Sequence, residues 1–139
     1  MRIGRSEKMN AEAFQHLAAP PRVLLAEDNA LIALDLEELL RTYGCDVIGP
    51  SVTVQEALDV LTYQEIDIAV VDYLLEDGEA DPLALALDRK GIPYAICTGA
   101  GQDKIGSLYP NTPIIGKPFT PEDVSVVVNC LIASRLAHS

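Results

Sequence analysis

Carboxylate side chains directly follow short apolar stretches at two places in the sequence. Glu27 and Asp28 come after the first of these stretches, and Asp72 ends another. If the fold gathers these acids, their charges repel one another, so they must share protons or hold a cation. Oxygen ligands with no His or Cys nearby favour Mg²⁺. We predict an Mg²⁺ site with Asp28 and Asp72 as direct ligands, Glu27 acting through a water, and a backbone carbonyl just after Asp72, such as that of Leu74, completing the set.

Two further polar side chains, Thr98 and Lys117, stand at the ends of later apolar stretches. Mg²⁺, a Lys ammonium and a Thr hydroxyl all neutralise or bind phosphoryl oxygens. Asp72 is then the candidate nucleophile, forming an aspartyl phosphate. Each residue also has a plain structural alternative, because Asp72 can start a turn, Lys117 can be a surface lysine and Thr98 can be a packing residue. Their common position after apolar stretches favours the chemical interpretation.

The stretch that ends in Asp72 also indicates the fold. It is apolar without alternation and too short for a helix, which is typical of a strand buried on both faces of a parallel sheet. Segments with helical periodicity or helix-capping residues separate it from similar stretches. We expect strands over 23–26, 46–49, 66–72, 94–98 and 114–116, alternating with helices over 30–42, from 54 onward, over 82–90, weakly over 99–109, and over 121–135.

Five repeats of strand and helix with short connections predict an α/β fold. The expected architecture is a doubly wound five-stranded parallel sheet with helices on both faces. The ends of all its strands then meet at one edge, where ligands bind in open α/β sheets. Asp81 and Pro82 are predicted as the N-cap and first residue of the third helix, and the Lys117-Pro118 bond is a candidate for the cis form.

Composition restricts the class of protein further. With 139 residues, one domain is expected, with an N-terminal extension over 1–20, containing a short helix over 11–17, and a folded domain over 21–139. A net charge of −11 argues against a nucleic-acid surface. The three cysteines form no CxxC pair, and no apolar stretch has the length of a membrane span or the form of a signal peptide. We therefore expect a cytoplasmic protein with reduced thiols.

Four short motifs occur in an order that resembles the receiver domain of bacterial two-component response regulators. They are Glu27-Asp28, Val71-Asp72, Thr98-Gly99 and Lys117-Pro118-Phe119, and the resemblance covers about residues 22–136. It implies the flavodoxin-like strand order 2-1-3-4-5. It also implies phosphotransfer to Asp72 from a phosphohistidine of a sensor histidine kinase or histidine phosphotransferase, with Mg²⁺ required. Phosphorylation would draw Thr98 and Lys117 inward. The protein is thus expected to be a phosphoacceptor rather than an enzyme.

The chain also departs from that family. Receivers usually carry an aromatic residue in the fifth strand, three positions before the lysine, where this chain has Ile114. The segment 91–99 resembles an alphaproteobacterial type of single-domain receiver that lacks this aromatic, although that type usually places an aromatic where Ala100 stands. We predict that the glycine-containing loop and weak helix over 99–109 carry the switch. Because Leu74 and Ala100 have no side-chain hydrogen-bonding group to orient water, loss of the phosphoryl group is expected to be slow.

The output and the alternative functions follow from what the sequence lacks. No output domain is expected after the last helix, so the phosphorylated surface would act on an unidentified protein, with Val126 and Ile132 as an exposed apolar patch or as ordinary core residues. A receiver-like scaffold that is never phosphorylated stays an alternative. An aspartyl-phosphate hydrolase of the haloacid dehalogenase type is less favoured, since Asp72-Tyr73-Leu74 lacks its second Asp. A dinucleotide-binding module would need GxGxxG after the first strand.

Overall fold

A computed structural model describes residues 19–99 and 102–137. Its main sheet is parallel, in the order β2-β1-β3-β6-β7, with β1 at Arg22–Ala26, β2 at Asp46–Ser51, β3 at Ile68–Asp72, β6 at Tyr94–Thr98 and β7 at Ile114–Gly116. Counted within this sheet, the order is 2-1-3-4-5, so the predicted flavodoxin-like topology is confirmed. The predicted short helix over 11–17 lies outside the described residues.

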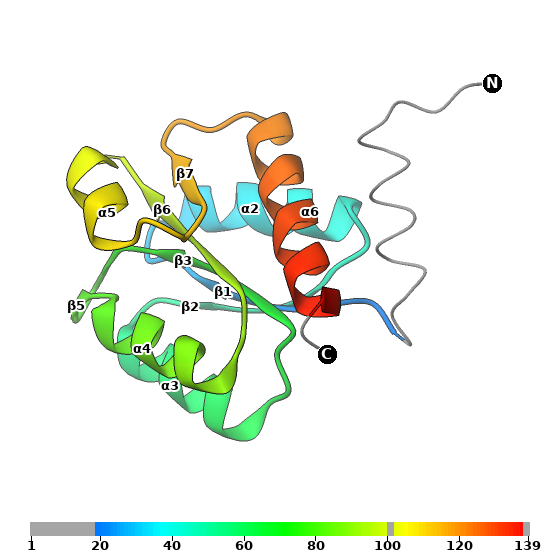
Figure 1. Ribbon diagram of the computed structural model, residues 1–139, viewed down its shortest axis with the longest axis horizontal. Helices are drawn as coiled ribbons and strands as arrows, with labels where there is room; N and C mark the ends of the chain where they lie inside the picture. Colours follow the sequence, from blue (N-terminus) through cyan, green and yellow to red (C-terminus); the bar gives the residue numbers. More distant parts are fainter. Residues whose placement is uncertain (1–18, 100–101, 138–139) are drawn as a thin grey trace.

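Helices cover both faces of the sheet, as the sequence predicted (Figure 1). On one face lie α2 (Ala30–Thr42) and α6 (Pro121–Ala137), which pack on Val23, Leu25 and Val70 of the sheet. On the other face lie α3 (Val54–Tyr63), α4 (Asp81–Lys90) and the short α5 (Gln102–Leu108). All five residues of β3 are buried, in agreement with the continuous apolar stretch that predicted this strand.

The helix starts follow local side-chain chemistry. Thr53 caps α3 by accepting the Glu56 N–H at 2.9 Å, and the Thr120 hydroxyl accepts the Asp123 N–H at the start of α6. At α4 the prediction was one residue off. The N-cap is Ala80, and Asp81 is the first helical residue. The Asp81 carboxylate does not cap the helix, because it accepts hydrogen bonds from two tyrosine hydroxyls.

Two further features were not predicted. A short antiparallel hairpin, β4 (Leu74–Leu75) with β5 (Gly78–Glu79), follows Asp72 before α4 begins. Strand β2 continues past Gly49 through a cis Gly49-Pro50 bond to Ser51, with a shift in its register against β1. The predicted cis Lys117-Pro118 bond is present.

The last helix distinguishes between the two alternatives given for Val126 and Ile132. Val126 is exposed, but Ile132 is buried and belongs to the core, so the two residues do not form a patch.

Among the described residues, no helix is long and apolar enough to cross a membrane.

Candidate functional site

The carboxyl ends of four adjacent parallel strands meet at one edge of the sheet. Glu27 directly follows β1, Asp72 ends β3, Thr98 ends β6 and Lys117 directly follows β7. Glu27, Asp28 and Asp72 each offer one carboxylate oxygen, and these oxygens lie within 4.8 Å of one another. Residues that are 90 positions apart in the chain are therefore neighbours in the structure.

The Lys117 ammonium lies between two of these acids. Its Nζ is 2.7 Å from Glu27 Oε1 and 2.8 Å from Asp72 Oδ2, and only 16% of the side chain is exposed. The Lys117 main chain is fixed as well, because its N–H donates to the Thr98 carbonyl at 3.0 Å. The position of this ammonium excludes the alternative of a free surface lysine.

Glu27 is held by hydrogen bonds from the main chain. It is 1% exposed, its own N–H donates to the Ser51 carbonyl at 2.9 Å, and its Oε2 accepts the Asn29 N–H at 3.0 Å. Burial raises the pKa of Glu27 to about 7, with the charge of Lys117 opposing and the neighbouring Asp72 adding to this change. The Glu27 carboxyl can therefore gain or lose a proton near neutral pH, and a bound divalent cation would compete with that proton.

Lys117 responds to the same surroundings in the opposite sense. Burial alone would lower its pKa, but hydrogen bonds and charge attraction from Asp72 and Glu27 outweigh burial and leave the pKa raised. The ammonium thus stays protonated at neutral pH and supplies a permanent positive charge beside Asp72.

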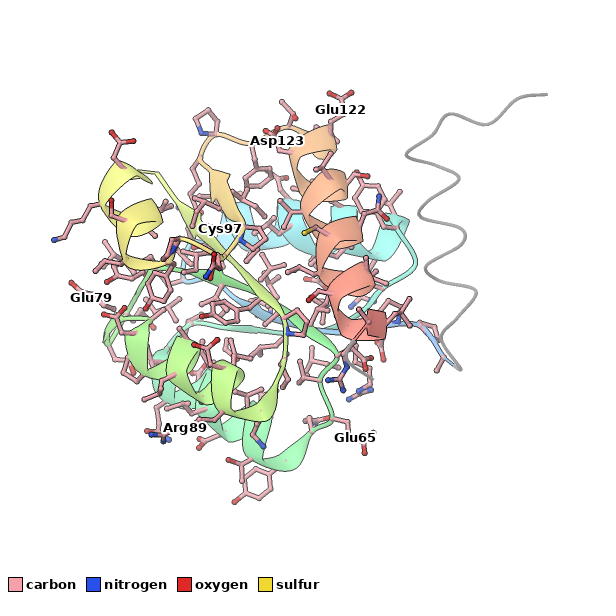
Figure 2. The ribbon with its side chains drawn as sticks, in the orientation of Figure 1. Glu65, Glu79, Arg89, Cys97, Glu122 and Asp123 are labelled. Atoms are coloured by element: carbon pink, nitrogen blue, oxygen red, sulfur yellow. The ribbon has the colours of Figure 1, made fainter. Side chains whose placement is uncertain are left out.

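The other predicted site residues lie around this centre. Asp28 is exposed, while Thr98 is buried next to Cys97, whose main chain pairs with Asp72 across the sheet. The Leu74 N–H faces Asp72 Oδ1 at 3.5 Å and the Leu74 side chain is exposed; its carbonyl stays a predicted ligand. Ala100 lies outside the described residues. Figure 2 labels Cys97, which is fully buried inside the molecule.

Two supporting residues, Asn29 and Ser51, were not predicted from the sequence. Asn29 both caps α2, by accepting the Leu31 and Ile32 N–H groups, and donates its own N–H to Glu27. Asn before a helical pattern is a capping signal that could have identified this residue. Ser51 could not have been found, because its role depends on the register shift in β2.

The arrangement has the chemistry of a hard-cation site with its own ammonium group. Carboxylate oxygens on two strands face one another, which suits an oxygen-preferring divalent ion such as Mg²⁺. Beside them, the Lys117 cation lies 2.8 Å from Asp72, and the buried Thr98 ends the neighbouring strand β6. The fold and the site together define a flavodoxin-like α/β domain with an acidic site at the carboxyl edge of its parallel sheet.

Comparison with known proteins identifies the family. No protein-family model matches the sequence. The chain is similar to SdrG from Sphingomonas melonis Fr1, at 32% identity and a TM-score of 0.71 over 86% of this chain and 99% of that one. It is also similar to a response regulator receiver protein from Sinorhizobium medicae WSM419, at 26% identity and a TM-score of 0.74 over 84% of this chain and 97% of that one.

Among curated proteins, the chain is 32% identical to the phyllosphere-induced regulator PhyR of Methylorubrum extorquens, over 85% of this chain and 46% of PhyR. The chain spans less than half the length of the curated relatives that it matches. It belongs to the receiver domain family of response regulators.

Proposed function

We propose that this protein is the phosphoacceptor of a two-component phosphorelay and receives a phosphoryl group on Asp72. The donor is a phosphohistidine of a sensor histidine kinase or a histidine phosphotransferase. The observation that carries the proposal is the position of Asp72, which is 8% exposed, 2.8 Å from the Lys117 ammonium and within 4.8 Å of two other acids. The acting unit is residues 21–139, in the cytoplasm.

The transfer itself needs an ionised Asp72. One of its carboxylate oxygens attacks phosphorus, the P–N bond to the donor imidazole breaks as the new P–O bond forms, and the imidazole keeps the electron pair. Lys117 is already within hydrogen-bonding distance of Asp72 and would pair with an oxygen of the incoming group. The product is an acyl phosphate, a mixed anhydride of Asp72.

The acidic residues fit an Mg²⁺ ion, since their oxygens face one another at the strand ends. Asp28 and Asp72 would hold it directly, Glu27 through a water, and the Leu74 carbonyl would complete the protein ligands. When bound, the ion supplies positive charge for the phosphoryl oxygens. In its place, the metal-free protein uses the Lys117 ammonium to balance part of the acidic charge.

Thr98 and Lys117 would pass the change at Asp72 to the rest of the chain. The Thr98 carbonyl accepts the Lys117 N–H, so these two strand ends move together. The changed surface would then act on a protein partner. Exposed apolar side chains on the site side of the molecule, Leu31 and Leu74, are available for such a contact.

A small phosphodonor tests the proposal directly. The protein is incubated with acetyl phosphate and Mg²⁺, and the mass of the intact chain is measured together with that of Asp72→Asn. Asp35→Asn, which changes an exposed acid on α2, is the matched control. We expect one phosphoryl group on the wild type and the control, labile to hydroxylamine, and none on Asp72→Asn. No uptake by the wild type, or uptake that persists in Asp72→Asn, would overturn the proposal.

A further inference from the structure

Two tyrosine hydroxyls share one carboxylate beside the candidate site. The Tyr73 hydroxyl is 3.2 and 3.1 Å from the two carboxylate oxygens of Asp81, and the Tyr109 hydroxyl donates to the same carboxylate. The two rings meet edge to face, with centroids 6.4 Å apart and an interplanar angle of 69°. We name Tyr73, Asp81 and Tyr109 the tyrosine–carboxylate cluster.

The cluster connects the segment after β3, the start of α4 and the end of α5, and the Ala80 N–H, at the N-cap of α4, also donates to the Tyr73 carbonyl at 2.7 Å. Tyr73 directly follows the candidate phosphoacceptor, and its N–H donates to the Cys97 carbonyl of β6 at 3.0 Å. Asp81 is the first residue of α4. Tyr109 directly follows α5, and its N–H donates to the Ile105 carbonyl at 2.9 Å. The Asp81 carboxylate therefore links the residue after β3 to the end of α5 through two side-chain hydrogen bonds.

The surroundings make both contacts persistent. Tyr73 is 9% exposed, and burial together with the Asp81 charge raises its pKa to about 12. The pKa of Tyr109 is raised for the same reasons. Both hydroxyls therefore remain protonated donors at neutral pH, and hydrogen bonds to a charged acceptor are stronger than neutral ones. Glu79, at the rim of the molecule in Figure 2, lies 3.3 Å from the Tyr73 hydroxyl and is an alternative acceptor for its single hydrogen.

The short helix α5 is held by core packing and by the cluster, since Ile105 is buried and the Tyr109 ring packs against the same core. It has seven residues, of which Ile105 is buried in the core, and it follows a segment rich in glycine. Such a short helix has little stability of its own. The hydrogen bond from Tyr109 to Asp81 adds a directional contact to the packing of this ring and fixes the end of α5 relative to the residue after β3.

We propose that Asp81 is the coupling residue of this domain, joining occupancy of Asp72 to the position of α5 through Tyr73 and Tyr109. The proposal rests on the proposed function, since it takes Asp72 as the group whose state changes. It assigns to Asp81, Tyr73 and Tyr109 a role in positioning rather than in the transfer of the phosphoryl group.

Amide hydrogen exchange of α5 tests this coupling, with beryllofluoride and Mg²⁺ as the probe of Asp72. Tyr109→Phe removes one hydroxyl from the cluster, and Tyr63→Phe removes the same group from an exposed tyrosine on α3 as the control. In the wild type and the control, the probe should change exchange in residues 102–109. In Tyr109→Phe we expect exchange in α5 to be faster by about tenfold before the probe is added, and the response to the probe to be lost.

A second measurement separates this proposal from the first. Binding of beryllofluoride is followed in each variant by exchange at residues 72–75, next to Asp72. The coupling proposal is overturned if Tyr109→Phe binds the probe and its α5 responds as in the wild type. It is supported if Tyr109→Phe still binds the probe but its α5 no longer responds. Asp81→Asn should then lose the same response, and the double variant Asp81→Asn/Tyr109→Phe should behave like either single variant. If the wild type binds no probe at residues 72–75, the proposed function itself fails.

Discussion

Lowering the pH from about 8 to about 6 should weaken Mg²⁺ binding about tenfold, through the buried Glu27. The pKa of this carboxyl is raised to about 7 by burial. Single-site titration then leaves about nine in ten Glu27 groups ionised at the higher pH and about one in ten at the lower pH. Because a proton and a divalent cation compete for the same negative charge, the apparent Kd rises by the ratio of these fractions.

Isothermal titration of the protein with MgCl₂ at constant ionic strength measures this dependence. Proton release on binding near pH 7 should also make the observed heat depend on the ionisation enthalpy of the buffer. Glu27→Gln is the control, since it should bind more weakly but with no dependence on pH in this range. Equal Kd values for the wild type at the two pH values, or the same dependence in Glu27→Gln, would refute the reasoning.

The same carboxyl makes the stability of the metal-free protein depend on pH. The pKa in the folded protein, about 7, lies above the ordinary value of 4.5, so the folded chain binds this proton more tightly than the unfolded chain. The contribution to stability is fully present below about pH 4.5 and is lost as the pH rises through about 7. Urea unfolding of the wild type and Glu27→Gln at the two ends of this range checks the direction.

Three further predictions concern single residues. Gly49→Ala should destabilise the protein by about 3 kcal/mol or more in urea unfolding, because the added Cβ would lie 2.5 Å from a carbonyl oxygen of β1 and the backbone has φ +125°. Gly44→Ala is the control, with φ +87° and nothing within 4 Å of the added Cβ, and should cost about 1 kcal/mol. Equal losses in the two variants would contradict this account. Leu74→Asn should shorten the lifetime of the phosphoryl group, measured by loss of mass with time, because an amide can orient water beside Asp72; an unchanged lifetime would count against slow loss through Leu74. Cys130 is exposed, whereas Cys45 and Cys97 are buried and burial raises the pKa of each of these two thiols to about 12. One thiol of the three should therefore react with a disulfide reagent in the folded protein, and all three after unfolding.

The strands and the central acids could be predicted because their signals are local. Continuous apolar stretches specify buried parallel strands, and the residue after each stretch must lie at one edge of the sheet. That rule predicts that Glu27, Asp72 and Lys117 lie near one another. Their distances in the structure agree with it.

The features that were not predicted depend on contacts between distant segments. Asp81 precedes Pro82 as an N-cap would, yet its carboxylate is used by tyrosines 8 and 28 positions away. Helical spacing places Ile132 beside the apolar stripe of its helix, but α6 buries a wider face than one stripe. The extension of β2 to Ser51 depends on a register shift against β1 that no periodicity reveals.

The ammonium group of Lys117 has a consequence for the order of events during assembly. Since the chain brings its own counter-charge to Glu27 and Asp72, it need not wait for a metal before the strand ends can close together. Chelators should accordingly leave the fold intact, in contrast to small domains that fold only when they bind zinc. The free energy of ion binding is then not needed to keep the protein folded, so occupancy of the ion site can change with conditions while the fold stays the same.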